Sequence, residues 1–114
     1  MATIRREGDE VVVLLNDIEK MGALRANVRV PASAVRSVRV AEQPFREIRG
    51  LRAPGTGFPR VIALGTWRYS GGKDFVAEYR GEPAVVVELE GADFRRLVVS
   101  SHDAVRLRDE LEPA

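Results

Sequence analysis

The chain has 114 residues, of which 45% are hydrophobic and 31% are charged, and its formal net charge at pH 7 is +1. This composition predicts one folded domain, residues 1–114 with a core over roughly residues 9–111, large enough to be stable without disulfides or bound metal. The absence of cysteine excludes disulfide scaffolds and thiolate metal sites. The single histidine leaves little nitrogen for binding a metal. The near-zero net charge gives no overall attraction to nucleic acid. We therefore expect no metal, no cofactor and no nucleic-acid partner.

The sequence predicts neither a membrane span nor an export signal. No apolar run approaches the roughly 18 residues that cross a bilayer. The first residues mix both signs of charge where a signal peptide has an apolar segment. Sixteen of the 18 basic residues are arginine, a bias typical of high-GC bacterial genomes. We expect a bacterial cytoplasmic protein.

The N-terminal third predicts strands around one short helix. The apolar run Glu10–Leu15 is typical of a strand. Asn16 with Glu19 three residues later forms a capping box, which predicts a helical turn that Gly22 ends. Alternation of apolar and polar residues then predicts two more strands: residues 24–30, and residues 37–41 with a bulge near Arg36.

The interval 42–60 has a different composition, with three prolines, three glycines and four arginines. We expect a short helical turn at Phe45–Ile48, whose apolar residues would pin the segment to the core. The rest of the interval predicts an ordered long loop. Long loops in small domains often carry function.

The C-terminal half predicts four strands followed by a helix. Glycine-containing turns at 70–73, 81–83 and 91–93 separate the apolar runs. Ser100 and Asp103 form a second capping box before a helix with an apolar stripe of Ala104, Leu107 and Leu111. The predicted total is seven strands, three and then four, with one C-terminal helix that fills the open side of a bent sheet.

Four segments carry a resemblance to a known fold: Leu51–Gly57, Ile62–Trp67, Gly71–Phe75 and Arg80–Leu89. With the predicted order of elements they resemble the pleckstrin-homology-like (PH-like) fold, and more narrowly the small PH-like proteins of unassigned function in actinobacteria. The resemblance implies a mainly β fold, a partly open seven-stranded antiparallel barrel with one C-terminal capping helix. It also implies a non-enzymatic scaffold that binds peptides, proteins or, in some relatives, anionic lipid headgroups.

The arginine-rich segment 45–60 is the strongest candidate site. Guanidinium groups suit carboxylate or phosphate, and the neighbouring glycines let backbone amides approach an anion. The plainer interpretation is that these arginines solvate a loop or pair with the acidic C-terminal third. Residues 44–81 carry seven basic and three acidic side chains, and residues 82–114 carry four basic and eight acidic ones. The candidate partner-binding residues are Arg46, Arg49, Arg52, Arg60, Trp67 and Lys73.

Two motifs imitate catalytic signatures. Gly71-Gly72-Lys73 lacks the earlier glycine of a phosphate-binding loop and is followed by Asp74 instead of Ser or Thr, so a hairpin turn is the better interpretation. The segment Ser100–Asp103 contains the residue types of a hydrolase triad, but adjacent residues rarely converge as nucleophile and base. We expect no catalytic residues and no enzyme activity.

These observations favour a non-catalytic binding or scaffold module that recognises a protein or peptide. An exposed strand edge, or the groove between that edge and the helix, would supply main-chain hydrogen bonds and side-chain pockets. The same edge would allow self-association into homo-oligomers. The alternative is a peripheral binder of anionic lipid headgroups or another polyanion through the arginine-rich segment 45–60.

Overall fold

A computed structural model describes residues 1–58 and 61–113 of the chain. Within these residues the protein forms nine strands, two α-helices and two short 3-10 helices. In chain order the elements are β1 (Thr3–Glu7), β2 (Glu10–Leu14), α1 (Asp17–Ala23), β3 (Val28–Pro31), η1 (Ala32–Ala34), β4 (Val35–Ala41), η2 (Pro44–Glu47), β5 (Leu51–Phe58), β6 (Ile62–Tyr69), β7 (Gly72–Tyr79), β8 (Ala84–Leu89), β9 (Arg96–Ser100) and α2 (Ala104–Leu111).

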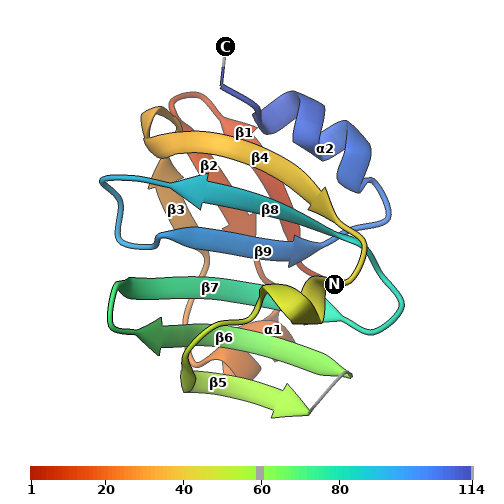
Figure 1. The fold of residues 1–114 in the computed structure, drawn as a ribbon. Helices are drawn as coiled ribbons and strands as arrows, with labels where there is room; N and C mark the ends of the chain where they lie inside the picture. Colours follow the sequence, from red (N-terminus) through yellow and green to blue (C-terminus); the bar gives the residue numbers. More distant parts are fainter. Residues whose placement is uncertain (59–60, 114) are drawn as a thin grey trace.

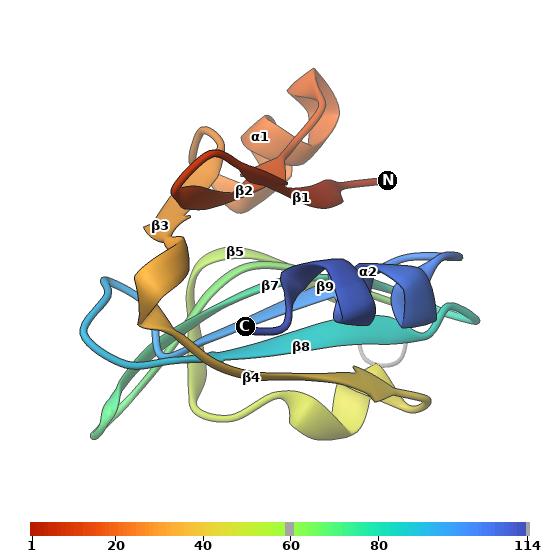
Figure 2. The same ribbon diagram turned by 90° about the horizontal axis from the view of Figure 1, so that it is seen from above.

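The fold is mainly β, as predicted, but its strands form two open sheets (Figures 1 and 2). The smaller sheet has the order β1-β2-β3, and the larger has the order β4-β8-β9-β7-β6-β5 with β7 and β9 parallel. The predicted partly open seven-stranded antiparallel barrel is therefore wrong. Among the described strands, the outer strands of the larger sheet, β4 and β5, do not pair with the smaller sheet, so neither sheet closes.

The main hydrophobic core lies between the two sheets. It includes Val11 and Val13 of the smaller sheet and Phe75 and Leu97 of the larger, all buried. Helix α2 contacts β1, β4 and β8, so it fills the side of the sandwich where the edge strands of the two sheets diverge (Figure 2). Its predicted stripe of Ala104, Leu107 and Leu111 is buried. This confirms a C-terminal helix that packs on the sheet.

Helix α1 begins at the predicted capping box, because Asn16 and Glu19 exchange both side-chain to backbone hydrogen bonds. The helix does not end at Gly22 but runs to Ala23, with Leu24 in the left-handed region at φ 55°. Gly22 serves packing instead, since an added Cβ would lie 3.1 Å from the Leu64 side chain. Because of this left-handed turn the next strand begins later than predicted: the structure has β3 at Val28–Pro31, where the sequence predicted a strand over residues 24–30.

Two strands were missed by the sequence prediction. The charged residues of β1 hide its alternation, and β5 occupies half of the interval predicted to be a long loop. The bulge near Arg36 is confirmed by a register shift between Val35 and Ser37. The second capping box is wrong. Asp103 is the N-cap of α2 but makes no side-chain cap bond, and the Ser100 hydroxyl instead accepts a hydrogen bond from the Tyr79 backbone amide.

The chain between β4 and β5, residues 42–50, crosses the face of the larger sheet that points away from the smaller one (Figure 1). We call this segment the strap and this side of the sheet the outer face. The predicted helical turn is confirmed as η2, and Phe45 and Ile48 pack on a second apolar cluster that includes Trp67, Val76 and Val98. The strap thus links the two edges of one sheet. None of the helices in the described residues is long and apolar enough to cross a membrane.

Candidate functional site

Strand register arranges the outer-face side chains in three rows across the larger sheet. One row contains small residues on either side of a single carboxylate: Ala41, Ala84, Ser100, Glu78, Ala63 and Gly57. The middle row is mostly apolar: Arg39, Val86, Val98, Val76, Gly65 and Gly55. The third row is mostly charged: Ser37, Glu88, Arg96, Asp74, Trp67 and Arg52. The strap crosses these rows.

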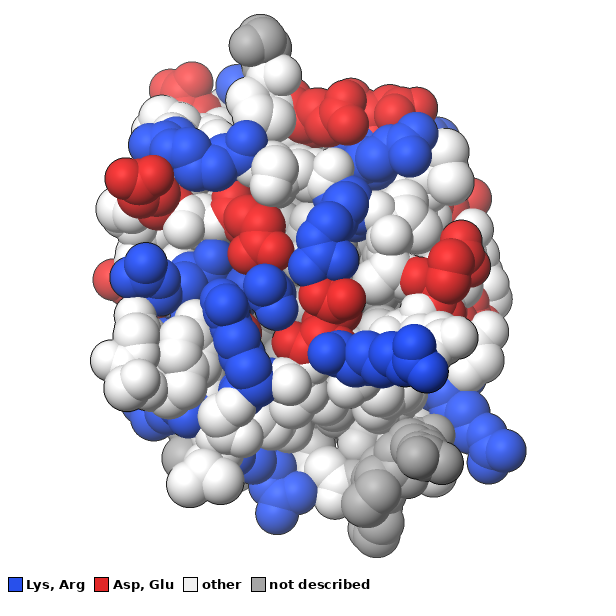
Figure 3. Space-filling model, viewed as in Figure 1, with Lys and Arg blue, Asp and Glu red and all other residues white. Residues whose placement is uncertain are grey.

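Charged side chains on this face pair with one another, and Figure 3 shows basic and acidic residues interleaved over it. Arg96 Nε donates to Glu88 Oε1 at 3.0 Å and Arg96 Nη1 to the Glu47 carbonyl at 3.1 Å. Arg39 bonds both Glu88 and Glu47. The hydrogen bond from Arg39 lowers the pKa of Glu47 below its usual value. This network ties the strap to β4, β8 and β9.

Arg49, a predicted site residue, belongs to a second structural cluster. Its Nε donates to Asp74 Oδ2 at 2.6 Å, and its guanidinium lies 4.5 Å from the centre of the Tyr69 ring. The Tyr69 hydroxyl donates to Asp74 Oδ1 at 2.7 Å. Burial, with the hydrogen bond to Asp74, raises the pKa of Tyr69 to about 12. Because Asp74 is only 1% exposed, this cluster anchors the end of the strap.

The other predicted site residues do not converge on one point. Arg46 is exposed on the strap, while Arg52 Nη1 donates to the Gly57 carbonyl at 3.1 Å. Trp67 is buried in the outer-face cluster. Lys73 lies 4.9 Å from the Phe94 ring, which belongs to the main core. Arg60 lies outside the described residues. The strap and β5 therefore bring Arg46, Arg49 and Arg52 to the outer face. Lys73 instead contacts Phe94 of the main hydrophobic core.

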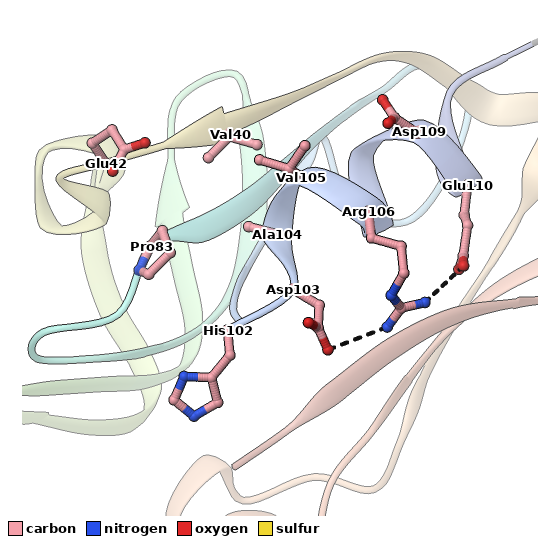
Figure 4. A pocket seen from close by; sticks show the side chains of 10 residues that line it. All are labelled: Val40, Glu42, Pro83, His102, Asp103, Ala104, Val105, Arg106, Asp109 and Glu110. Carbon is pink, nitrogen blue, oxygen red and sulfur yellow. Dashed lines mark hydrogen bonds and ion pairs between the residues drawn. The ribbon is translucent and has the colours of Figure 1, made fainter.

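A groove of about 680 Å³ runs between the edge strand β4 and helix α2 (Figure 4). Within the described residues β4 pairs with β8 alone, so its second edge is free of a neighbouring strand. Val40 from β4 and Val105 from α2 line the groove together with Pro83, and Val105 is 56% exposed. The groove therefore combines a strand edge with one exposed apolar side chain, Val105, and two half-buried ones.

Acidic side chains surround these apolar residues. Glu42, Asp103, Asp109 and Glu110 line the groove, and Arg106 is the basic side chain among its lining residues. Arg106 is occupied, since it donates to Glu110 at 2.7 Å and to Asp103 at 3.3 Å. The groove therefore presents net negative charge. The acidic composition of residues 82–114 was the signal in the sequence that could have located it.

His102 stands at one end of the groove and is exposed, as a helix-start residue should be. Its Nδ1 lies 2.8 Å from a carboxylate oxygen of Glu82, in the turn before β8.

Among the described residues, no group of three or more histidine, cysteine, aspartate or glutamate side chains could hold a metal ion. The chain matches no family model, curated protein or solved structure.

Glu78 is a second feature that the sequence did not reveal. Its side chain is 0% exposed on β7, and neither carboxylate oxygen has a hydrogen-bond partner among the described residues. Burial, assisted by the charge of Glu47, raises the pKa of Glu78 to about 8. On sequence alone Glu78 is one polar residue in an alternating strand, because its burial depends on the strap that covers it.

Proposed function

We propose that this protein is a non-catalytic binding module that recognises an extended peptide segment of a partner protein. The segment would lie in the groove between β4 and α2 and add a strand to the free edge of β4. The observation that carries this proposal is the edge of β4 that no other described strand pairs with, beside half-buried Val40 and exposed Val105. Strand addition supplies main-chain hydrogen bonds, and the groove supplies contacts for alternate side chains.

The charge of the groove supports a basic partner. Glu42 would attract a lysine or arginine side chain. Asp109 and Glu110, which already bond Arg108 and Arg106, would add to the negative potential that steers association. The apolar residues of the groove would take every second side chain, because successive residues of a strand point to opposite sides. The proposed ligand is therefore an extended segment in which basic and apolar residues alternate.

The direct test uses short synthetic peptides of alternating valine and lysine, with a valine and glutamate peptide of equal length as comparison. Binding is followed by fluorescence polarisation, and hydrogen exchange of the β4 amides by mass spectrometry. We expect the basic peptide alone to bind and to slow exchange in β4. The double variant Glu42→Lys/Asp109→Lys should weaken binding by about tenfold or more, because both charges face the peptide.

The matched control is Glu90→Lys/Asp93→Lys, which makes the same charge change at the other end of β8. We expect that variant to bind like the original protein. Equal losses in both double variants would reduce the interaction to overall charge and contradict a groove site. Binding without slower exchange in β4 would contradict strand addition.

The polyanion alternative receives less support from the outer face, since Arg49 is held by Asp74 and Arg52 by a backbone carbonyl. Arg46 is the better residue for a charge-reversal test, because reversing the charge of Arg49 would break its structural ion pair with Asp74. If anionic vesicles bind, and Arg46→Glu abolishes a binding that also falls steeply between about 50 and about 200 mM salt, the alternative function is the correct one.

A further inference from the structure

The row of small residues on the outer face encloses the Glu78 carboxylate, which has no hydrogen-bond partner within the described part of the chain. Ala63 lies beside Glu78 on one neighbouring strand, and Ser100 and then Ala84 follow on the other side. These side chains are too short to cover a glutamate. Glu78 is nevertheless 0% exposed, so the cover comes from the strap, where Phe45 and Ile48 pack on this cluster. An unpaired carboxylate in such surroundings is costly and calls for an explanation.

Two cavities flank this cover. One, of about 910 Å³, lies between the strap and residues 79–83. The other, of about 190 Å³, is lined by residues that include Phe45, Ile48, Arg52, Gly57, Ala63 and Trp67. Ala63 is the cross-strand neighbour of Glu78. The carboxylate therefore lies one small side chain beyond the wall of an aromatic-lined cavity.

Four arginines near this face bond other groups. Arg39 and Arg96 bond Glu88, Arg49 bonds Asp74, and Arg52 bonds a carbonyl, at the distances given above. None of these described arginines reaches Glu78, whose oxygens stay unpaired. Among the described residues, Asp74, Glu47 and Glu88 each have an arginine partner, and Glu78 has none.

We propose that the space beneath the strap is a binding site for a small primary alkylammonium ion, whose charged nitrogen pairs with Glu78. The alkyl body would replace the contacts of Phe45 and Ile48 with the sheet. Trp67 and Phe45 would offer aromatic faces that attract the ammonium group. At about 30 Å³ for each water-sized group, the smaller cavity admits about six non-hydrogen atoms, which is the size of n-pentylammonium. This site is separate from the peptide groove.

Binding of this ion must be linked to a proton. With a pKa of about 8, Glu78 is mostly neutral in the free protein at pH 7. An ammonium ion selects the charged carboxylate, so the carboxyl releases its proton to the buffer as the complex forms. The number of protons released at pH 7 should therefore be close to one. A peptide bound in the acidic groove would not produce this release from Glu78.

The test is titration calorimetry of the full chain with n-pentylammonium at pH 7, in two buffers that differ in ionisation enthalpy. We expect binding in the millimolar range or tighter with release of about one proton. Glu78→Gln should weaken the affinity by about tenfold or more, because the amide cannot form the ion pair. Glu78→Leu should lose n-pentylammonium but keep 1-pentanol, a neutral probe of similar size. Urea unfolding of both variants verifies that they are folded.

Glu110→Gln is the matched control, since it removes a carboxylate from the groove and leaves Glu78 intact. We expect it to bind n-pentylammonium normally. Three results would each overturn the proposal: no binding, binding unchanged by Glu78→Gln, or binding without proton release. Tighter binding of N-acetyl-lysine methylamide than of n-pentylammonium would assign the site to a lysine side chain of a partner protein, and would overturn a free amine as the ligand.

Discussion

At the scale of single residues, buried carboxylates differ most in the donors that surround them. Asp74 accepts hydrogen bonds from Arg49 and Tyr69, whereas Glu78, four residues later on the same face of β7, accepts none among the described residues. A buried carboxylate with strong donors holds its surroundings in place, and one without donors costs stability. Asp74 and Glu78, two acidic residues of one strand, therefore have opposite effects on the stability of the protein.

Asp74→Asn tests the anchoring role. The amide cannot accept both guanidinium bonds, so we expect the free energy of unfolding in urea to fall by about 2 kcal/mol. The loss stays below that of a fully buried ion pair because the Arg49 side chain is 38% exposed and water takes over part of its solvation. As the control, Glu90→Gln breaks an exposed ion pair with Arg36 and should change the free energy by less than about 1 kcal/mol. Similar losses in both variants would contradict the anchor.

At the scale of elements, helix α1 is held to the larger sheet by side-chain hydrogen bonds from two of its strands. The Tyr79 hydroxyl of β7 donates to Glu19, which also caps the helix. The Thr56 hydroxyl of β5 donates to the Gly22 carbonyl at 2.8 Å. The opposite side of α1 carries exposed Ile18 and Met21. Polar ties therefore complement apolar packing in holding this helix.

Tyr79→Phe removes one tie and leaves almost no cavity. Glu19 is 3% exposed and would lose a donor, so we expect a decrease of about 1 to 2 kcal/mol in the free energy of unfolding. Hydrogen exchange of the α1 amides should speed up more than exchange in β8 or β9. Ile18→Ser, at a side chain 81% exposed, is the control and should stay within about 0.5 kcal/mol. Uniform acceleration throughout the protein would show that the bond does not act locally.

The elements that the sequence predicted correctly are those specified by local signals. Turn glycines mark the hairpin between β6 and β7, the Asn16 capping box starts α1, and the phase error at Val35 marks the bulge. The two open sheets and the parallel pairing of β7 with β9 depend on contacts between distant segments, which no local pattern encodes. For the same reason the sequence suggested a groove beside an edge strand but not its residues, and it did not reveal the burial of Glu78.

At the scale of the whole molecule, the strap joins the two outermost strands of one sheet across its outer face. The ionic network of Arg39, Glu47, Glu88 and Arg96 fixes the strap on one side, and Asp74 with Arg49 fixes it on the other. Beneath it lies Glu78. The free energy of unfolding of the whole protein should therefore depend on the charge of Glu78.

Stability should fall as the pH rises from about 5 to about 8. In the folded protein the pKa of Glu78 is raised to about 8, while the unfolded chain titrates near 4.5. The unfolded state loses its proton first, so the unfolding free energy decreases across this window, by up to ~1.4 kcal/mol per pH unit. Urea unfolding at several pH values measures the slope. Glu78→Gln should flatten it, and an unchanged slope in that variant would contradict the assignment to Glu78.

The position of β9 has a consequence for how the protein is made. This strand lies between β7 and β8 in the larger sheet, yet residues 96–100 follow all the other strands in the chain. A chain emerging from the ribosome can pair β5, β6 and β7 on one side and β4 with β8 on the other, but β9 must arrive before the two groups join. Until then the apolar faces of these strands stay open to water, which is when chaperones bind and when aggregation begins.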